Sequence, residues 1–249
     1  MGVSRSKFYI KDSEKDIDIS FSSFSDDEKE FLRRKRLDIT IVECKDAFSS
    51  KVYADIFKLL NSGGKLLSAQ EIRNGVYWEL LLYDKLFEVN KNTTWRAIYG
   101  KESDVSKDVE ILLKILALNY YTVIKDNEIK IEYKGTFNWS NIMEEYSIKS
   151  ATWSKDEVLS QIKLLTDFID AIKNINRAEK KCNKAVFEAS FVAYTKTKCT
   201  EDIEYMWLCE LDKVKEFQKG EVLSNKKSVE SRLTRALYLI EEKYGVYHS

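Results

Sequence analysis

The chain has 249 residues, 33% charged and 44% hydrophobic, a balance typical of a globular protein that can bury its own core. Lysine plus arginine equals aspartate plus glutamate at 41 each, so no global field would attract nucleic acid or an anionic membrane. The only histidine, His248, lies next to the last residue, which excludes catalysis that needs an imidazole inside the fold, such as a Ser-His-Asp triad or a zincin.

The cysteines and the apolar runs indicate the cellular setting. Four cysteines show neither C-x-x-C spacing nor the density of a disulfide scaffold, and they predict reduced thiols in a cytoplasmic protein. The most apolar run, Ile111 to Ile124, is interrupted by Lys114 and is shorter than a membrane span. We therefore expect no membrane partner.

The N-terminal region combines short strands with one helix. Three runs show the β patterning typical of strands: Phe8 to Ile10, Ile17 to Phe21 and Ile39 to Glu43. A helix is predicted to begin at the capping box Ser25-x-x-Glu28. The basic run that follows, residues 33–36, is interpreted as the C-terminal turn of this helix, where cations suit the helix dipole, rather than as a DNA contact.

One nuclease-like pattern occurs in this region. Glu43-Cys44-Lys45 at the end of a strand matches the E-x-K half of a PD-(D/E)xK-like site, and Asp18 in an earlier strand could supply the second carboxylate. Asp18 and Glu43 would hold a divalent cation, and Lys45 would stabilise charge developing in the reaction. The alternative is a solvated loop after a core strand, because E-x-K triplets are frequent by chance. Apart from this candidate, we expect no metal site.

A helix, a glycine corner and a second helix follow. The apolar stripe from Val52 to Leu60 predicts a helix that ends at Gly63-Gly64, where glycine can adopt the left-handed conformation. The second helix begins at another capping box, Ser68-x-x-Glu71, and is predicted to continue to Phe87.

The polar face of the second helix is the candidate ligand site. Gln70, Arg73 and Asn74 lie one helical turn apart, and the corner is expected to bring Asn61 close to them. Amide groups and a guanidinium together suit a phosphate or a nucleobase edge. In the alternative interpretation Arg73 pairs with a nearby acid, Asn61 only caps its helix, and the corner is structural.

The rest of the chain is predicted to be mainly helical. A buried apolar helix is expected over Asp108–Lys125 and a strand over Ile129–Tyr133. Further helices are expected over Ser140–Tyr146, Ser154–Ile175, Cys182–Lys198, Glu201–Gln218 and Ser228–Tyr244. The predicted fold is α+β and predominantly α-helical, with a small N-terminal β remnant followed by a helical bundle. The weak seam at 134–136 divides it into domains 1–134 and 135–249.

The glycine corner carries a family resemblance. Residues 56–74 read I-F-x-x-L-N-S-G-G-x-x-L-x-x-Q-E-I-R-N and resemble the signature of domain-of-unknown-function family 262, a ParB/sulfiredoxin-related domain of GmrSD-type modification-dependent restriction enzymes and other bacterial anti-phage proteins. Three further segments are similar to later parts of the family: Trp95–Gly100, Asp108–Ala117 and Asn183–Ala189. The resemblance spans about Asp38 to Tyr194.

The chain also departs from the family pattern. Two segments that the family uses for nucleotide handling, Q-R-x-[YF]-x-W and D-G-Q-Q-R, do not occur, so the resemblance covers the C-terminal portion of a ParB-like domain. Lys107 and Lys114 stand where the family tends to have arginine, which disfavours a bidentate phosphate contact there. The resemblance implies a ligand site at the corner, formed by Asn61, Ser62, Gly63, Gly64, Gln70, Arg73 and Asn74.

These expectations define the predicted function. The resemblance implies a non-catalytic or half-site subunit of a bacterial anti-phage, restriction-like complex, in which a partner protein supplies the missing N-terminal half of the domain. The chain alone would hold no cofactor; a nucleotide could bind in the assembled complex, and DNA could be contacted through it. The alternatives are the metal-dependent nuclease and a helical adaptor without ligand binding.

Overall fold

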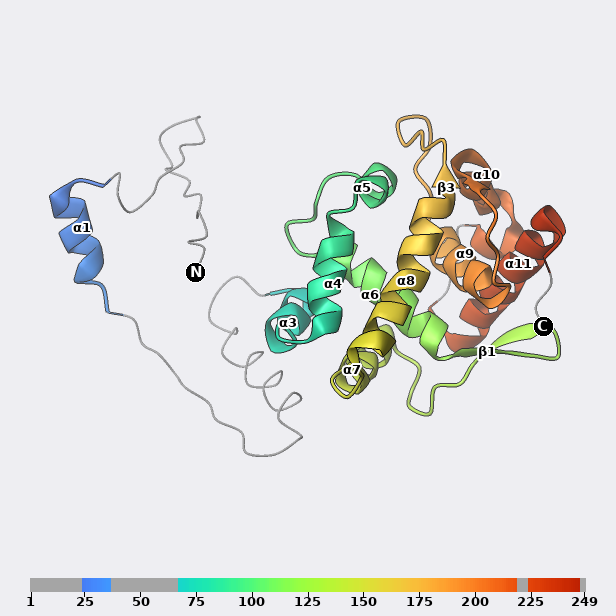
Figure 1. Cartoon of the computed structure of the whole chain (residues 1–249), viewed down its shortest axis with the longest axis horizontal. Helices are drawn as coiled ribbons and strands as arrows, with labels where there is room; N and C mark the ends of the chain where they lie inside the picture. The colour runs from blue at the N-terminus through green and yellow to red at the C-terminus, as the bar shows by residue number, and fades with distance from the viewer. Residues whose placement is uncertain (1–23, 37–66, 219–223, 247–249) are drawn as a thin grey trace. The chain divides into compact units, whose positions relative to one another are not determined.

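The computed structural model describes residues 24–36, 67–218 and 224–246 (Figure 1). The first range belongs to a separate unit and is described by itself. It contains α1 (Asp26–Arg33), whose N-terminus is closed by the predicted capping box between Ser25 and Glu28. Arg33 occupies the last turn, so the basic run begins where the helix ends, as predicted.

The larger body, residues 67–218 and 224–246, is mostly helical. Its elements are α3 (Ala69–Val76), α4 (Leu81–Asn90), α5 (Thr93–Tyr99), α6 (Lys107–Tyr120), β1 (Thr122–Lys125), β2 (Glu128–Ile131), α7 (Trp139–Ser150), α8 (Lys155–Ala171), β3 (Ile172–Lys173), α9 (Lys184–Lys196), β4 (Ile203–Glu204), α10 (Tyr205–Glu210), the short 3-10 helices η3 (Leu211–Lys213) and η4 (Lys215–Phe217), and α11 (Lys226–Tyr244). The described strands form two separate two-stranded sheets. A predominantly helical fold with a small β part is thus confirmed; the three predicted N-terminal strands lie outside the described residues.

Helix α6 is the centre of the larger body. It is buried on nearly every side, as predicted for this apolar segment, and it contacts α3, α4, α7, α8 and α9 (Figure 1). One hydrophobic core continues from α4 through α6 to α9 and α11. Side chains such as Leu112 and Phe191, on either side of the predicted boundary at 134/135, belong to this same core.

The helix predicted from Ser68 to Phe87 is interrupted. The capping box between Ser68 and Glu71 is present, but α3 ends at Val76 and α4 begins after a turn, so this prediction was wrong in its length. The Tyr77 and Tyr83 rings, one on each side of the turn, are both buried with centroids 5.6 Å apart. The turn allows both rings to reach the core, which outweighs the local preference for one continuous helix.

Residues 122–125 form a strand rather than the predicted end of a helix. β1 pairs antiparallel with β2 through the register Thr122↔Ile131 to Lys125↔Glu128. The two turn residues, Asp126 and Asn127, have φ angles of 51° and 61°, a left-handed conformation that these short polar residues tolerate. The turn reverses the chain, so the apolar run is divided between a helix and a hairpin.

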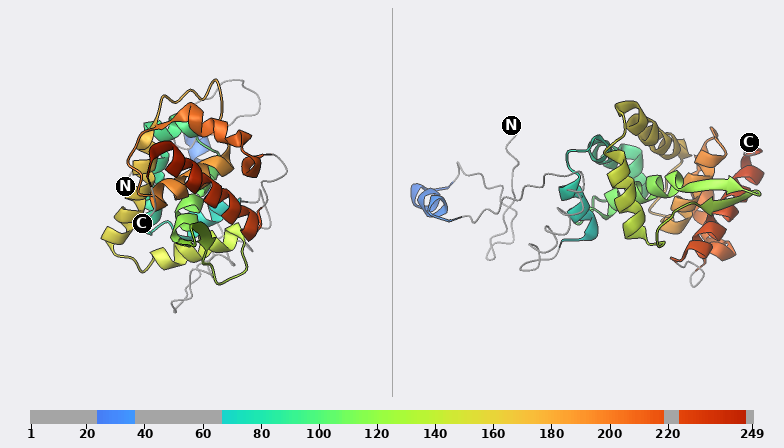
Figure 2. Two further views of the ribbon diagram at one scale, coloured as in Figure 1. Left: turned by 90° about the vertical axis from the view of Figure 1, so that its right-hand side faces the viewer. Right: turned by 90° about the horizontal axis from the view of Figure 1, so that it is seen from below.

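The outer edge of this hairpin is covered by α11 (Figure 2). The Ile129 N–H donates to Thr234 Oγ1 at 2.9 Å, and the Ile131 N–H donates to Glu230 Oε1 at 2.8 Å. The backbone donors of β2 that point away from β1 are therefore satisfied by side chains of a helix.

A two-residue parallel pairing, Ile172↔Ile203 and Lys173↔Glu204, accounts for two further differences. The helix predicted to Ile175 ends at Ala171 because the next two residues form β3. The predicted single helix over residues 201–218 is divided into β4, α10, η3 and η4, since its first residues pair with β3. Ala185, Ala189 and Ala193 of α9 are buried, and α9 packs extensively on α11, which agrees with their four-residue spacing.

Candidate functional site

The predicted polar stripe of α3 lies inside the molecule. Gln70 and Arg73 are 1% and 3% exposed, and Asn74 is half-buried. Gln70 donates from Nε2 to Asn74 Oδ1 at 2.8 Å and accepts at Oε1 from Arg73 Nε at 2.9 Å. The three side chains therefore form one connected group, as their helical spacing predicted.

The rest of the Arg73 guanidinium is used by neighbouring helices. Nη2 contacts Glu110 Oε1 of α6 at 3.3 Å, and Nη1 contacts Ser140 Oγ of α7 at 3.4 Å. Beside it the Tyr77 hydroxyl donates to Glu144 Oε1 at 2.6 Å. The adjoining cavity holds only about 20 Å³, which is room for a water molecule and too little for a phosphate.

The other predicted members of this site are not described. Asn61, Ser62, Gly63 and Gly64 lie outside the described residues, so a ligand at the glycine corner stays a prediction. The same holds for the nuclease candidates Asp18, Glu43 and Lys45. Within the described part, Arg73 joins α3 to α6 and α7.

A second polar network joins α4, α5 and α6. Asp108, fully buried at the start of α6, accepts from Arg96 Nη1 at 2.9 Å and from Asn90 Nδ2 at 3.2 Å. Asn90 Oδ1 in turn accepts from Arg96 Nη2 at 2.8 Å and from Trp95 Nε1 at 2.9 Å. This network fixes the indole of Trp95 in one orientation, and it brings α5 into direct contact with the start of α6.

The charge of Asp108 is maintained by its donors. Burial acts to raise the pKa of this carboxyl group, but hydrogen bonds outweigh burial and hold the pKa below its ordinary value. The donors are the backbone N–H groups of Ser103 and Val109 and the side chains of Asn90 and Arg96. Asp108 is therefore an anion that serves as a structural counter-charge.

Lys114 of α6 faces a buried acid. Its Nζ lies 2.7 Å and 2.8 Å from the two carboxylate oxygens of Glu188 on α9, and 3.9 Å from the centroid of the Trp139 ring. This lysine is committed to an ion pair between α6 and α9.

A cavity of about 350 Å³ lies between α5, the first turns of α6 and the start of α9. Its floor is apolar and partly aromatic, with Trp95, Ile98, Ile111 and Phe187 buried. Its rim carries four cationic side chains: Lys101, Arg177, Lys181 and Lys184. These residues were not identified in the sequence; the density of lysine and arginine between 177 and 184 is the signal that could have indicated them.

Tyr99 stands at the wall of this cavity. Burial, together with the Asp108 carboxylate, raises the pKa of the Tyr99 phenol, while Arg96, Ser103 and Arg177 act to lower it. The phenol is therefore a neutral hydroxyl at physiological pH.

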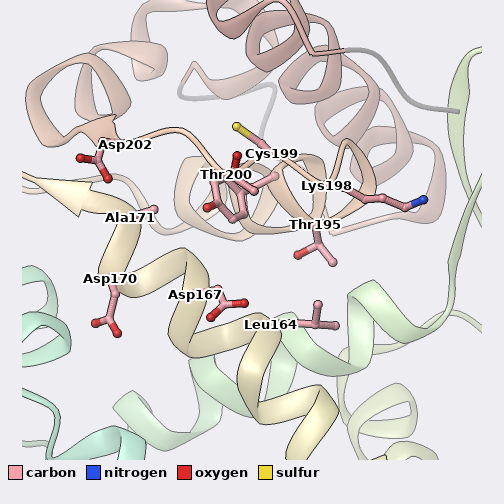
Figure 3. A pocket seen from close by; sticks show the side chains of 10 residues that line it. Leu164, Asp167, Asp170, Ala171, Thr195, Lys198, Cys199, Thr200 and Asp202 are labelled. Carbon is pink, nitrogen blue, oxygen red and sulfur yellow. The ribbon is translucent and has the colours of Figure 1, made fainter.

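A second cavity, of about 500 Å³, has the opposite charge (Figure 3). Asp167 and Asp170 of α8 and Asp202 line it, and Lys198 extends away from them. Two of these carboxylates already have cationic partners, since Lys163 lies 2.7 Å from Asp167 and Lys173 lies 3.5 Å from Asp202. This cavity is thus largely neutralised by the chain itself.

The described residues contain neither a metal-binding cluster nor a helix that could span a membrane. Among them, no group of three or more His, Cys, Asp or Glu side chains is arranged to hold a metal ion. No helix in the described ranges is both long enough and apolar enough to cross a membrane.

No protein-family model, no curated protein and no solved structure matches this chain. The functional interpretation therefore depends on the residues and their contacts.

Proposed function

We propose that this chain is a non-catalytic, cytoplasmic subunit of a bacterial anti-phage, restriction-like complex. It would complete a ParB-related, nucleotide- or DNA-responsive domain together with a partner protein that supplies the missing N-terminal half. The observation that carries the proposal is the family-like signature of residues 56–74, whose second helix is α3.

The contacts of α3 are compatible with this role. Arg73 connects α3 to α6 and α7 through Glu110 and Ser140, so the helix after the glycine corner is held in place. The family-like segments around Arg96 and Asp108 meet in one network. These contacts support a shared framework that includes α3, α5 and α6.

An exposed tryptophan supports a protein partner. Trp78, in the turn after α3, is 68% exposed, although tryptophan is among the residues most enriched at protein interfaces. It lies close in sequence to the end of the signature, where a protein that completes the domain would approach.

The helical adaptor remains the second candidate, and one observation favours it. Arg73, the strongest ligand-binding candidate of the stripe, is 3% exposed and occupied by Gln70, Glu110 and Ser140. Such an arginine stabilises the fold without any ligand.

Purification from the native locus tests the proposal. The tagged chain, expressed with its neighbouring genes, is expected to co-purify with a protein that carries the Q-R-x-[YF]-x-W and D-G-Q-Q-R segments, and deletion of either gene should abolish protection in a phage plating assay. A monodisperse chain with no such partner, together with unchanged phage sensitivity, would contradict it.

Trp78→Ala tests the partner surface. Because the side chain is largely exposed, the variant should fold normally but bind the partner about tenfold or more weakly, as expected for an interface tryptophan. Leu159→Ala on α8, also an exposed apolar residue, is the matched control and should keep full binding. Equal affinities of both variants and the unaltered chain would remove Trp78 from the interface.

A further inference from the structure

The cationic rim of the 350 Å³ cavity has no carboxylate partner among the described residues. None of the residues that line it is acidic. Within the described ranges, Lys101, Arg177, Lys181 and Lys184 make no salt bridge to a carboxylate within 4.0 Å, whereas Lys114 and Lys180 nearby each have an acidic partner. Converging like charges repel each other, so this arrangement favours binding of an anion.

The side chain of Arg177, which lines the cavity, packs closely against the backbone of Gly100. An added Cβ at Gly100 would lie 2.7 Å from Arg177 Cζ and within 2.9 Å of both terminal nitrogens. Gly100 also has a φ of 101°, a backbone angle that residues with a side chain rarely adopt. The planar guanidinium is therefore packed against a backbone that only glycine can provide, and this packing limits its freedom before any ligand arrives.

The aromatic surface that the cavity offers to a ligand is the ring of Tyr99, which is half-buried, whereas Trp95 and Phe187 are only 1% and 4% exposed. The Trp95 ring lies 5.3 Å from the Tyr99 ring and 5.5 Å from the Phe187 ring, measured between centroids. Trp95 is held by its hydrogen bond to Asn90, so it supports the Tyr99 ring from a fixed position. A partly exposed aromatic ring beside a cationic rim suits a ligand with a flat heterocycle at one end and phosphates at the other.

The size and shape of the cavity favour a small molecule over a strand of nucleic acid as the ligand. Its volume of about 350 Å³ is within the range of small-molecule sites. The four cations come from two segments that line the same cavity: the residue after Gly100, and the stretch 177–184, which ends at the first residue of α9. A convergent cluster fits the compact charge of one polyphosphate better than the extended backbone of a nucleic acid.

We propose that this cavity binds a mononucleotide, with the base against Tyr99 and the phosphates among Lys101, Arg177, Lys181 and Lys184. The site differs from the predicted site at the glycine corner. The proposal rests on residues of this chain alone, so it can be tested without the proposed partner. The complete chain by itself is therefore the sample for the test.

Calorimetric titration of the purified complete chain compares ADP, pyrophosphate and adenosine as probes. ADP should bind more tightly than either fragment, and its affinity should fall as NaCl is raised. Arg177→Gln should lower the affinity for ADP about tenfold, the usual effect of losing a charge-assisted hydrogen bond. Lys181→Gln and Lys184→Gln, at exposed positions, should lower it about twofold to fivefold each. Thermal melts of each variant check that the fold is kept.

The matched control is Lys198→Gln, which removes the same charge from the rim of the acid-lined cavity and should leave the affinity for ADP unchanged. Three results would overturn the proposal: no binding of ADP, pyrophosphate binding as tightly as ADP, or equal affinities of all variants. Binding of a short single-stranded oligonucleotide without binding of ADP would also overturn it and would indicate a nucleic-acid surface instead. Absence of a partner in the co-purification would leave this result unaffected.

Discussion

Two arginines of this protein have opposite surroundings. Arg73 is 3% exposed, and its donors are used by Gln70, Ser140 and Glu110. Arg177 is half-buried against Gly100, and it has no salt bridge among the described residues. The first arginine belongs to the polar stripe that the sequence indicated as a ligand site, and the second lies in a loop that the sequence did not distinguish. A sequence motif therefore identifies a residue type, whereas the surrounding charges decide whether its donors remain available to a ligand.

The two larger cavities repeat this contrast. Asp167 and Asp202 have lysine partners at 2.7 Å and 3.5 Å, so the acid-lined cavity retains little uncompensated charge. For the four cations of the base-lined cavity, the described residues supply no such partners. Substitutions in paired and unpaired charges should therefore differ in their effect on stability.

The largest loss of stability is expected for Asp108→Asn. The change leaves Arg96 without its counter-charge and weakens the network that joins α4, α5 and α6. Removing one partner of a buried pair costs about 3 kcal/mol or more in the free energy of unfolding, measured by urea denaturation. Asp104→Asn, at an exposed position, is the matched control and should change it by less than about 0.5 kcal/mol. Equal values for the two variants would show that the network contributes little.

The stabilisation that Asp108 provides should depend on pH, and the lowered pKa of its carboxyl group fixes the direction of that dependence. Because the pKa of Asp108 is lowered in the folded protein, the anion contributes stability above the ordinary aspartate value of about 3.9, and this contribution is lost as pH falls through the folded pKa. The difference in unfolding free energy between the unaltered chain and Asp108→Asn should therefore shrink as the pH is lowered below about 4. A difference independent of pH would contradict the assignment.

A smaller loss is expected for Arg73→Gln. The change removes an almost fully buried cation and leaves Gln70 Oε1 without its donor, while the partly exposed Glu110 can be solvated by water. We expect a loss of about 2 kcal/mol in chemical denaturation, the usual cost of a buried polar group left without a partner. Retained stability combined with lost defence activity would indicate a ligand at Arg73 instead.

The smallest effect is expected for Arg177→Gln, the same chemical change at the unpaired arginine. Removing one of four converging cations breaks no salt bridge, so the unfolding free energy should stay within about 0.5 kcal/mol, with any change toward higher stability. Arg73→Gln is the matched control, because it makes the same chemical change at an arginine that has an acidic partner. A loss at Arg177 as large as that at Arg73 would mean that Arg177 has a structural role.

Local rules predicted part of this molecule well. The capping boxes at Ser25 and Ser68 and the apolar segment that becomes α6 depend on neighbouring residues, and the sequence is sufficient to identify them. The Gln70–Arg73–Asn74 group was also predicted, since helical spacing places these side chains together. That the group faces α6 and α7 could not be predicted, because the acceptors on those helices are far away in the sequence.

Tertiary contacts determined what the sequence did not indicate. The turn at Asp126-Asn127 directly follows the apolar run Ile111 to Ile124, and the last residues of that run fit a helical pattern although they form β1. β3 and β4 each have two residues, too few for a detectable pattern. The cationic cavity combines Lys101 with the segment 177–184, and only folding brings them together.

The covered edge of the β1–β2 hairpin has a consequence during protein synthesis. Thr234 and Glu230, which satisfy the outward N–H groups of β2, follow their partners by 105 and 99 residues. At a translation rate of about 5–20 residues per second, the hairpin would leave the ribosome roughly 5–20 seconds before α11 is complete. During that interval the edge of β2 is open to other nascent chains. Slow translation of the segment before α11 should therefore increase the demand for chaperones, although it leaves the finished fold unchanged.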